Sequence, residues 1–237
     1  MVALPLARAV GRAGRVVGLD LSGGMLAVAR AKAQAEGLMA PHGPLELVEQ
    51  DADVAAFPPG AFDAITCSAA LPFLPDTPRS LATWRDWLRP GGAGGGSGSG
   101  GLLAFNAFAA PNTPEFGIFL RLLKDRHGIE VEDPCARLGS EERCGAAMAA
   151  AGFVDVQVTR EEFDDTRPRP LDAFVEGWWR QCAGSPFAPL DALLRPEQVE
   201  ALRVEFVAQA TASAAQRLVG GSVVNRAVTF VVTGRRP

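Results

Sequence analysis

The stretch VVGLDLSGGMLAVARA, residues 16–31, carries the pattern that decides the fold. Its β-branched residues favour an extended backbone, so residues 15–20 are expected to form a buried strand that ends at Asp20. Ser22 is a preferred N-cap residue, and the apolar spacing after it predicts a helix over 23–36. A strand that passes into a helix in this way is typical of α/β proteins.

Strands and helices are expected to alternate along most of the chain. Helices are predicted at 4–10, 23–36, 77–88, 112–126, 140–152, 171–182 and 196–218, and strands at 15–20, 45–51, 61–71, 102–108, 153–163 and 225–236. The first of these helices is too short to persist alone, so it must pack against another element. The alternation predicts an α/β domain with a mainly parallel sheet.

Composition and charge exclude several classes of protein. Of the 237 residues, 48% are hydrophobic and 21% charged, as in an ordinary globular protein. The formal net charge is -4 and no long basic run occurs, so nucleic acid is not an expected partner. No apolar stretch is long enough to span a bilayer. The basic residues of 1–15 follow its apolar part, unlike those of a signal peptide, and no targeting peptide is visible.

The four cysteines are widely separated: Cys67, Cys135, Cys144 and Cys182. No pair has the C-x-x-C spacing of a zinc site, so no metal site is predicted. We expect buried or free thiols in a reducing compartment, either the cytoplasm or an organelle lumen.

The segment AGGGSGSGG, residues 93–101, interrupts every periodic pattern and is expected to be a flexible insert. Phosphate binding by these glycines is the alternative, but a strand rather than a helix follows them, so no helix N-terminus is available for an anion. We expect residues 1–110 to form a nucleotide-binding core that contains this insert. Residues 111–237 are expected to form a cap region and the last two strands of the sheet.

Successive strand ends present polar or small residues. Asp20 and Asp51 end the first two predicted strands, and Ser68 and Ala69 lie near the end of the third. Ligands of doubly wound sheets lie at the carboxyl ends of strands, and a carboxylate there can accept hydrogen bonds from ribose hydroxyls. Plain structural roles remain open: Asp20 as a charge at a helix N-terminus, Asp51 as a loop acid, and Met25 as a core residue.

Three segments resemble class I S-adenosylmethionine-dependent methyltransferases in their order and spacing: GRVVGLDLSGGMLAVARAKAQAEGL, LVEQDADVAAFPPGAFDAITCSAALPFLPD and WLRPGG. The nearest group includes the quinone-biosynthesis C-methyltransferases and small-molecule methyltransferases of type 11. The resemblance covers residues 1 to about 108 and continues loosely to the last strand. It implies a Rossmann-like α/β fold, with helices on both faces of a mainly parallel sheet and an antiparallel closing strand.

The resemblance also implies that S-adenosylmethionine is the cofactor and which residues hold its adenosine. Asp20 would bind the ribose hydroxyls, and Leu21 and Met25 would border the adenosine. Asp51 and Ala52 would contact the edge of the adenine.

Four further residues would lie toward the reacting end of the cofactor. Ser68 and Ala69 would approach its methionine part, and Leu71 and Phe73 would lie near the methyl donor and the substrate. The region 109–180 would form part of a substrate wall or lid.

The chain departs from the family at its first residue. Family members have a central first strand that ends in a glycine-rich turn, whereas this sequence begins inside the helix that should follow that turn. We therefore expect a chain that is truncated at its N-terminus and binds the cofactor weakly, since neighbouring strands lose hydrogen-bond partners.

Methyl transfer to a small, hydrophobic molecule is the expected function. No catalytic residue is assigned; His127, Glu115 and Asp125 are candidate bases if the acceptor must lose a proton. A catalytically inactive binding or interaction protein is one alternative, and an NAD-dependent oxidoreductase is another. The second is disfavoured because a short-chain dehydrogenase needs a catalytic tyrosine and this chain has none.

Overall fold

The structure is a computed structural model that describes residues 2–92, 100–110, 113–164, 169–184 and 188–237. Its first half contains α1 (Ala3–Val10), the 3-10 helix η1 (Gly11–Ala13), β1 (Val16–Asp20), α2 (Gly23–Ala35), β2 (Leu45–Glu49), β3 (Ala64–Ser68), η2 (Leu71–Phe73), α3 (Thr77–Trp87) and β4 (Leu102–Phe108). Its second half contains α4 (Pro114–His127), η3 (Pro134–Leu138), α5 (Glu141–Ala150), β5 (Val154–Asp164), β6 (Arg169–Pro170), α6 (Leu171–Ala183), α7 (Leu190–Leu193), α8 (Pro196–Ala215), β7 (Leu218–Val219), β8 (Ser222–Val223) and β9 (Arg226–Arg235).

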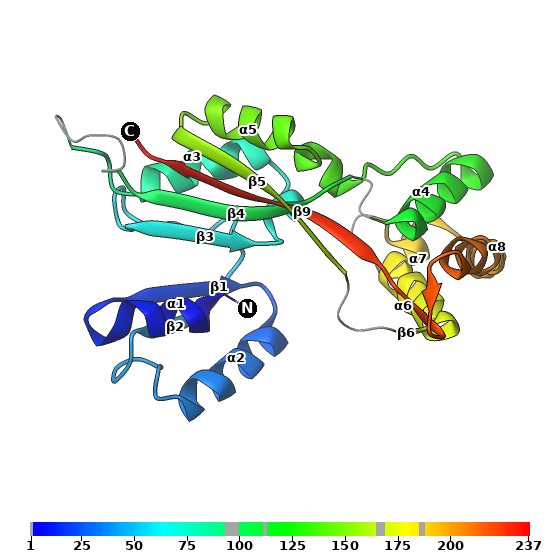
Figure 1. Ribbon diagram of the computed structural model, residues 1–237, viewed down its shortest axis with the longest axis horizontal. Coiled ribbons are helices and arrows are strands. Elements are labelled where there is room, and N and C mark those ends of the chain that lie inside the picture. The colour runs from blue at the N-terminus through cyan, green and yellow to red at the C-terminus, as the bar shows by residue number, and fades with distance from the viewer. Residues whose placement is uncertain (1, 93–99, 111–112, 165–168, 185–187) are drawn as a thin grey trace. The chain divides into compact units, whose positions relative to one another are not determined.

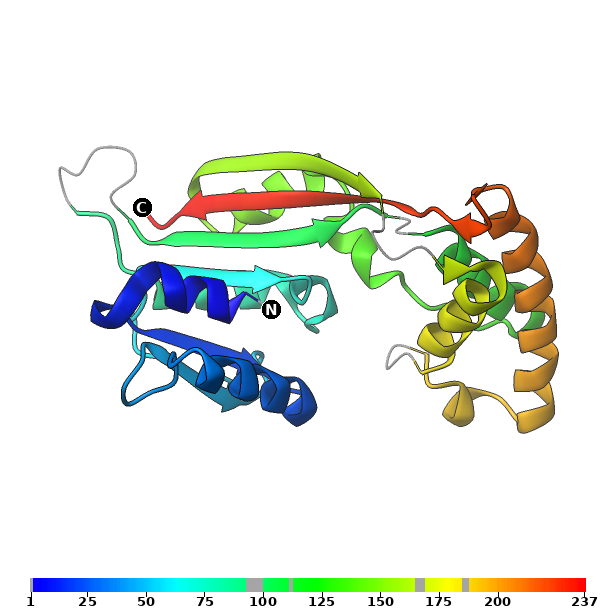
Figure 2. The ribbon, with the colours of Figure 1, turned by 60° about the horizontal axis from the view of Figure 1, so that its bottom comes forward.

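The described strands form three sheets, in the orders β1-β2, β3-β4-β9-β5 and β6-β8-β7 (Figure 1). β1 and β2 are parallel, with Val16 opposite Leu45. β9 runs antiparallel to β4, as Figure 2 shows. The hydrogen bonds agree with this direction: the Arg236 amide donates to the Gly101 carbonyl at one end of the pair, and the Ala109 amide donates to the Val228 carbonyl at the other. The fold is thus α/β and Rossmann-like, with an antiparallel closing strand.

Contacts divide the chain into two compact units. Unit 1 comprises 1–105, 148–156 and 233–237, and unit 2 comprises 106–147 and 157–232. The division expected near residue 110 remains a prediction, since the chain crosses between the units several times. The insert predicted at 93–101 lies almost entirely outside the described residues.

A small apolar core joins the first elements of unit 1. Its buried members come from α1, α2 and β2, among them Leu4, Ala29 and Leu45. The expectation that the first helix packs against another element is therefore confirmed. β1 differs from expectation, because its first four residues are half-buried rather than buried. In the described part of the chain β1 pairs with β2 alone, whereas a central parallel strand is paired along both of its edges.

Unit 2 is built around aromatic side chains. Phe119 of α4 and Phe206 of α8 are fully buried and meet edge to face, with ring centroids 6.3 Å apart. Trp179 of α6 lies 5.6 Å from the Phe206 ring. Edge-to-face pairs add stability beyond that of area burial, so this cluster holds α4, α6 and α8 together.

The boundaries follow from local chemistry. Ser22 accepts a hydrogen bond from the Met25 amide at the start of α2, as its N-cap role predicts. Thr113 caps α4 in the same way, and Gly128 ends that helix in the left-handed region at φ 66°. Three features had no clear sequence signal: the 3-10 helices, the short helix α7 and the three-stranded sheet of β6, β7 and β8.

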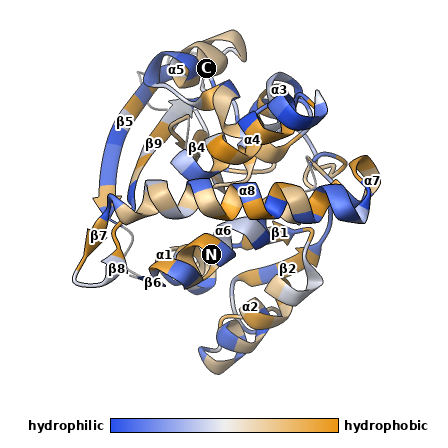
Figure 3. Cartoon of the chain, turned by 90° about the vertical axis from the view of Figure 1, so that its right-hand side faces the viewer, coloured by the Kyte–Doolittle hydropathy of each residue, from blue (hydrophilic) through white to orange (hydrophobic). Residues whose placement is uncertain are grey.

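Apolar and polar residues alternate along the helices (Figure 3). Within the described segments, no helix is both long and apolar enough to cross a bilayer. The same segments contain no group of His, Cys, Asp and Glu side chains that could hold a metal ion. All four cysteines are free thiols.

Candidate functional site

The carboxyl edge of the β1–β2 pair brings two predicted site residues together. Asp20 is paired in register with Glu49, and the Gln50 amide donates to the Asp20 carbonyl at 3.1 Å. Asp51 follows directly, so both predicted carboxylates lie at one edge of one sheet. The carboxyl ends of two parallel strands lie at the same edge of the sheet, so the spacing of the two acids in the sequence predicts this arrangement.

Each of the two carboxylates has one oxygen held by a backbone amide. Asp20 Oδ1 accepts from the Ser22 amide at 2.8 Å, and Asp51 Oδ1 accepts from the Asp53 amide at 2.9 Å. The second oxygen of each carboxylate has no protein partner among the described residues. Two oriented acceptors at one edge can therefore bind the hydroxyl or amine donors of a ligand.

Apolar side chains are exposed beside these acceptors. Leu21 is 71% exposed and Met25 is 53% exposed, so Met25 is not the core residue that its helical position allowed. Ala52 is half-buried in the turn after β2. Exposed apolar groups next to carboxylates match an adenosine, whose ribose donates hydrogen bonds and whose base is a flat apolar surface. The residues present thus fit the nucleoside part of S-adenosylmethionine.

Glu49 belongs to this edge, although sequence reasoning did not select it. A Cβ atom on Gly23 would lie 2.8 Å from Glu49 Oε2 and 3.1 Å from Oε1. The Glu49 carboxylate therefore covers the first turn of α2, where a helix dipole favours negative charge. The sequence could have indicated Glu49, because two parallel strands that end together place it opposite Asp20.

Ser68 and Ala69 lie at the end of β3, which pairs with β4 rather than with β1. Ala69 has φ 55°, a left-handed conformation that costs a non-glycine residue free energy. Leu71 is fully buried at the start of η2, whereas Phe73 at its end is 43% exposed. Burial raises the pKa of the neighbouring Cys67 thiol. Backbone hydrogen bonds from Ala70 and Leu71 lower this pKa and so offset part of the rise.

The three candidate bases differ in surroundings. Glu115, in the first turn of α4, is completely buried and forms an ion pair with Arg217. Asp125 is exposed, and His127 is half-buried in the last turn of the same helix. Glu115 is thus the one buried carboxylate among the described residues, and nothing in the local sequence pointed to its partner 102 positions away.

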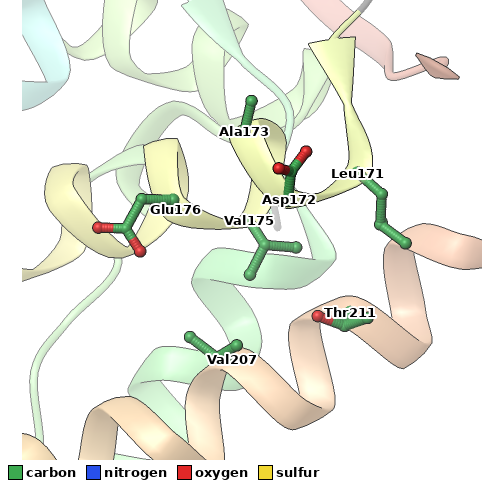
Figure 4. Close-up of a pocket in the computed structure, with 7 residues that line it drawn as sticks. All are labelled: Leu171, Asp172, Ala173, Val175, Glu176, Val207 and Thr211. Atoms are coloured by element: carbon green, nitrogen blue, oxygen red, sulfur yellow. The ribbon is translucent and has the colours of Figure 1, made fainter.

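Unit 2 also contains a pocket of about 660 Å³ between α6 and α8 (Figure 4). Leu171, Val175 and Glu176 line it from α6, and Val207 and Thr211 line it from α8. Its wall is mainly apolar. Glu176 is held at its rim by Arg203, with an N–O distance of 3.2 Å.

Comparison with known proteins finds methyltransferases among the similar sequences and structures. Residues 1–92 match the sequence model of a family described as a methyltransferase domain. The match covers the first 92 of the 237 residues, so that part of the chain is similar to a methyltransferase domain. The chain is 28% identical over 240 residues to the nocamycin O-methyltransferase of Saccharothrix syringae, covering 99% of this chain and 81% of that protein.

Two further relatives match shorter parts of the chain. A demethylmenaquinone methyltransferase of Thermus thermophilus is 34% identical over 152 residues, which cover 58% of this chain and 63% of the relative. A 2-phytyl-1,4-naphtoquinone methyltransferase of Trichormus variabilis is 33% identical over 141 residues, which cover 60% of this chain and 55% of the relative.

Solved structures support the fold assignment. The YcgJ protein from Bacillus subtilis superposes with a TM-score of 0.54 at 16% sequence identity, covering 94% of this chain and 82% of that chain. A Bacillus halodurans protein solved as a candidate methyltransferase gives a TM-score of 0.52 at 20% identity, covering 94% of this chain and 83% of that one.

Proposed function

We propose that this chain binds S-adenosylmethionine at the carboxyl edge of β1 and β2 and transfers its methyl group to a small hydrophobic molecule. The observation that carries the proposal is the pair of carboxylates, Asp20 and Asp51, each with one oxygen fixed and one available. Leu21, Met25 and Ala52 would border the adenosine, and Ser68 and Ala69 would approach the methionine part.

The chemistry that the bound cofactor supplies is a methyl group attached to a positively charged sulfur, which is already activated for displacement. The protein residues then need to orient the two partners and exclude water. Asp20 would hold the ribose through its available oxygen while the Ser22 amide fixes the other. Leu71 and Phe73 would lie near the reacting groups.

The acceptor class is proposed from two sources. Two relatives of this chain are named as a nocamycin O-methyltransferase and a 2-phytyl-1,4-naphtoquinone methyltransferase. The pocket between α6 and α8 is mainly apolar, as an acceptor of this kind requires.

One observation favours the alternative of a binding protein without activity. β1 and β2 form a two-stranded parallel sheet, and the described residues supply no third strand to it. The apolar core with α1 and α2 supports one side of this pair, but the missing third strand leaves one edge of β1 unpaired among the described residues, so cofactor binding is expected to be weak. Binding of cofactor without transfer to any acceptor would support this alternative.

Calorimetric titration with S-adenosylhomocysteine tests the proposal. Asp20→Asn keeps the shape of the side chain and removes the charge, and it should weaken binding about tenfold or more, because a charge-assisted hydrogen bond contributes about 1.5–3 kcal/mol. The matched control is Glu46→Gln on β2, an exposed carboxylate paired with Arg15 at 2.8 Å. Equal affinity in wild type and Asp20→Asn would remove Asp20 from the site, and binding of NADH instead would favour an oxidoreductase.

A further inference from the structure

Glu49 is the last residue of β2 and lies beside Asp20 at the carboxyl edge within unit 1. The parallel register of the two strands pairs these residues directly. Glu49 is exposed, and its carboxylate has no hydrogen-bond or ion-pair partner among the described residues. It therefore differs from Asp20 and Asp51, each of which has one oxygen held by a backbone amide.

The Glu49 carboxylate lies against the first turn of α2. A Cβ atom on Gly23 would be 2.8 Å from Glu49 Oε2, closer than side chains normally approach one another. The first turn of a helix has amide groups without intrahelical partners, and the helix dipole makes this turn a favourable position for an anion such as a phosphate. Glu49 thus brings a negative charge of the protein itself to the position that a phosphate would otherwise favour.

Little positive charge offsets the carboxylates at this edge. The segments that form it, residues 16–29 and 47–56, contain no Lys or Arg. Arg30, further along α2, donates to the Leu47 carbonyl at 3.2 Å rather than to a carboxylate. The acidic residues of the two segments are Asp20, Glu49, Asp51 and Asp53. The edge therefore has a negative potential, which favours a ligand with a positively charged sulfur and disfavours one with a phosphate.

We propose that Glu49 is a specificity-determining residue, which excludes nucleotides that carry a phosphate on a ribose hydroxyl. The inference deepens the proposed function and rests on it, because it takes Asp20 as the residue that holds the ribose hydroxyls. Asp20 Oδ1 accepts from the Ser22 amide, and Ser22 caps α2, so hydroxyls bound to Asp20 lie near the first turn of that helix. A phosphate attached there would meet the Glu49 carboxylate, whereas an unsubstituted ribose would not be repelled.

The probes are adenosine and adenosine 2′-monophosphate, each used to displace S-adenosylhomocysteine from the full chain in a calorimetric titration. Wild type should bind adenosine about tenfold or more tightly than the 2′-phosphate, because two or more carboxylates face the phosphate. Glu49→Gln keeps the size of the side chain and should reduce this preference about fivefold, the effect of one unit charge about 4 Å from another even in water.

A control ligand and a control variant show whether the effect is local. Adenosine 5′-monophosphate carries its phosphate at the other end of the ribose, so Glu49→Gln should change its affinity by less than about twofold, because repulsion falls with distance. Glu46 lies at the opposite end of β2 and is paired with Arg15 at 2.8 Å. Glu46→Gln removes a carboxylate from the same strand and should keep the wild-type preference.

An independent measurement on wild type needs no variant that must fold. Raising the salt concentration from about 50 mM to about 500 mM should reduce the preference for adenosine over the 2′-phosphate by about threefold, because salt screens charges at an accessible site. A preference that does not depend on salt would mean that shape rather than charge excludes the phosphate, and it would overturn the proposal.

Three further results decide between this inference and its alternatives. An unchanged preference in Glu49→Gln overturns the inference, and a lower urea midpoint in that variant would then show that Glu49 only stabilises the start of α2. Equal gains in affinity for the 2′- and 5′-phosphates would also overturn it. Failure of S-adenosylhomocysteine or adenosine to bind wild type would contradict the proposed function and the inference together, whereas binding of both without discrimination against the 2′-phosphate would contradict the inference alone.

Discussion

The two units place their polar groups in opposite surroundings. In unit 1, Asp20 and Asp51 lie at an accessible sheet edge, each with an oxygen that accepts no hydrogen bond from a described residue. In unit 2, Glu115 is sealed in the interior beside Arg217 and an aromatic core. An accessible carboxylate is available to a ligand and contributes little to stability, whereas a buried pair is coupled to the fold itself. Substitutions should therefore separate binding from stability according to the unit they fall in.

The largest effect is expected from breaking the buried pair. Glu115→Ala should lower the free energy of unfolding by about 3 kcal/mol, at the lower end of the range for a broken buried pair, because Arg217, whose side chain is half-buried, would lose its carboxylate partner. Urea denaturation followed by circular dichroism measures this. Glu205→Ala, at the exposed ion pair of the same unit, should change stability by less than about 1 kcal/mol. Equal losses in the two variants would contradict the contrast between buried and exposed pairs.

The reverse behaviour is expected at the accessible edge of unit 1. Asp20→Asn should cost about 1.5–3 kcal/mol in binding S-adenosylhomocysteine yet leave the free energy of unfolding within about 0.5 kcal/mol of wild type. The reason is that Asn keeps the oxygen that accepts from the Ser22 amide. A large stability loss would mean that Asp20 serves the fold more than the ligand.

The thiols of unit 2 predict an alkaline loss of stability. Burial, aided by the nearby Asp133 carboxylate, raises the pKa of Cys135 to about 12, and burial, aided by Glu115, does the same for Cys182. A pKa that is higher in the folded state gives stability that is fully present below the unfolded value and is lost as pH rises toward the folded value. Between about pH 8.5 and 10 we expect a loss of roughly 1 kcal/mol per thiol.

Urea midpoints at the two pH values measure this loss. Cys182→Ala removes one titrating group, so its stability should fall less steeply over the same interval, whatever its starting value. An unchanged slope in Cys182→Ala would show that this thiol does not resist ionisation in the folded protein.

The smallest effect tests backbone strain in unit 1. Ala69→Gly should raise the free energy of unfolding by about 0.5–1 kcal/mol, because glycine adopts a positive φ without steric cost. Ala70→Gly is the matched control, since Ala70 has φ -113° and gains nothing from glycine there. It should destabilise by about 0.5–1 kcal/mol. Destabilisation by both changes would argue against strain at Ala69.

Much of the fold was predictable from local patterns. The strand predicted at 102–108 is observed at Leu102–Phe108, and the helix predicted at 23–36 is observed at Gly23–Ala35. β-branched runs, helical periodicity and capping residues are local signals, so they survive in any tertiary context that does not oppose them. The short strands β6, β7 and β8 lacked such signals, because two residues are too few to show a period.

The candidate site of unit 1 follows the same logic. Asp20 and Asp51 could be placed at one edge from strand positions alone, because parallel strands end together. Three features could not be predicted in this way, since they depend on which atoms are already in contact. They are the available oxygens of the two acids, the exposure of Met25, and the position of the Glu49 carboxylate over Gly23.

The amino-acid sequence by itself determined the order of strands and helices, the α/β class and the acids at the strand ends, because these depend on neighbours within a few residues. Only the tertiary structure decided that β6, β7 and β8 form a sheet and that Glu115 is buried against Arg217. Both facts depend on contacts between distant residues. Burial then changes the energy of a charge far more than any local pattern does, because the protein interior solvates it poorly.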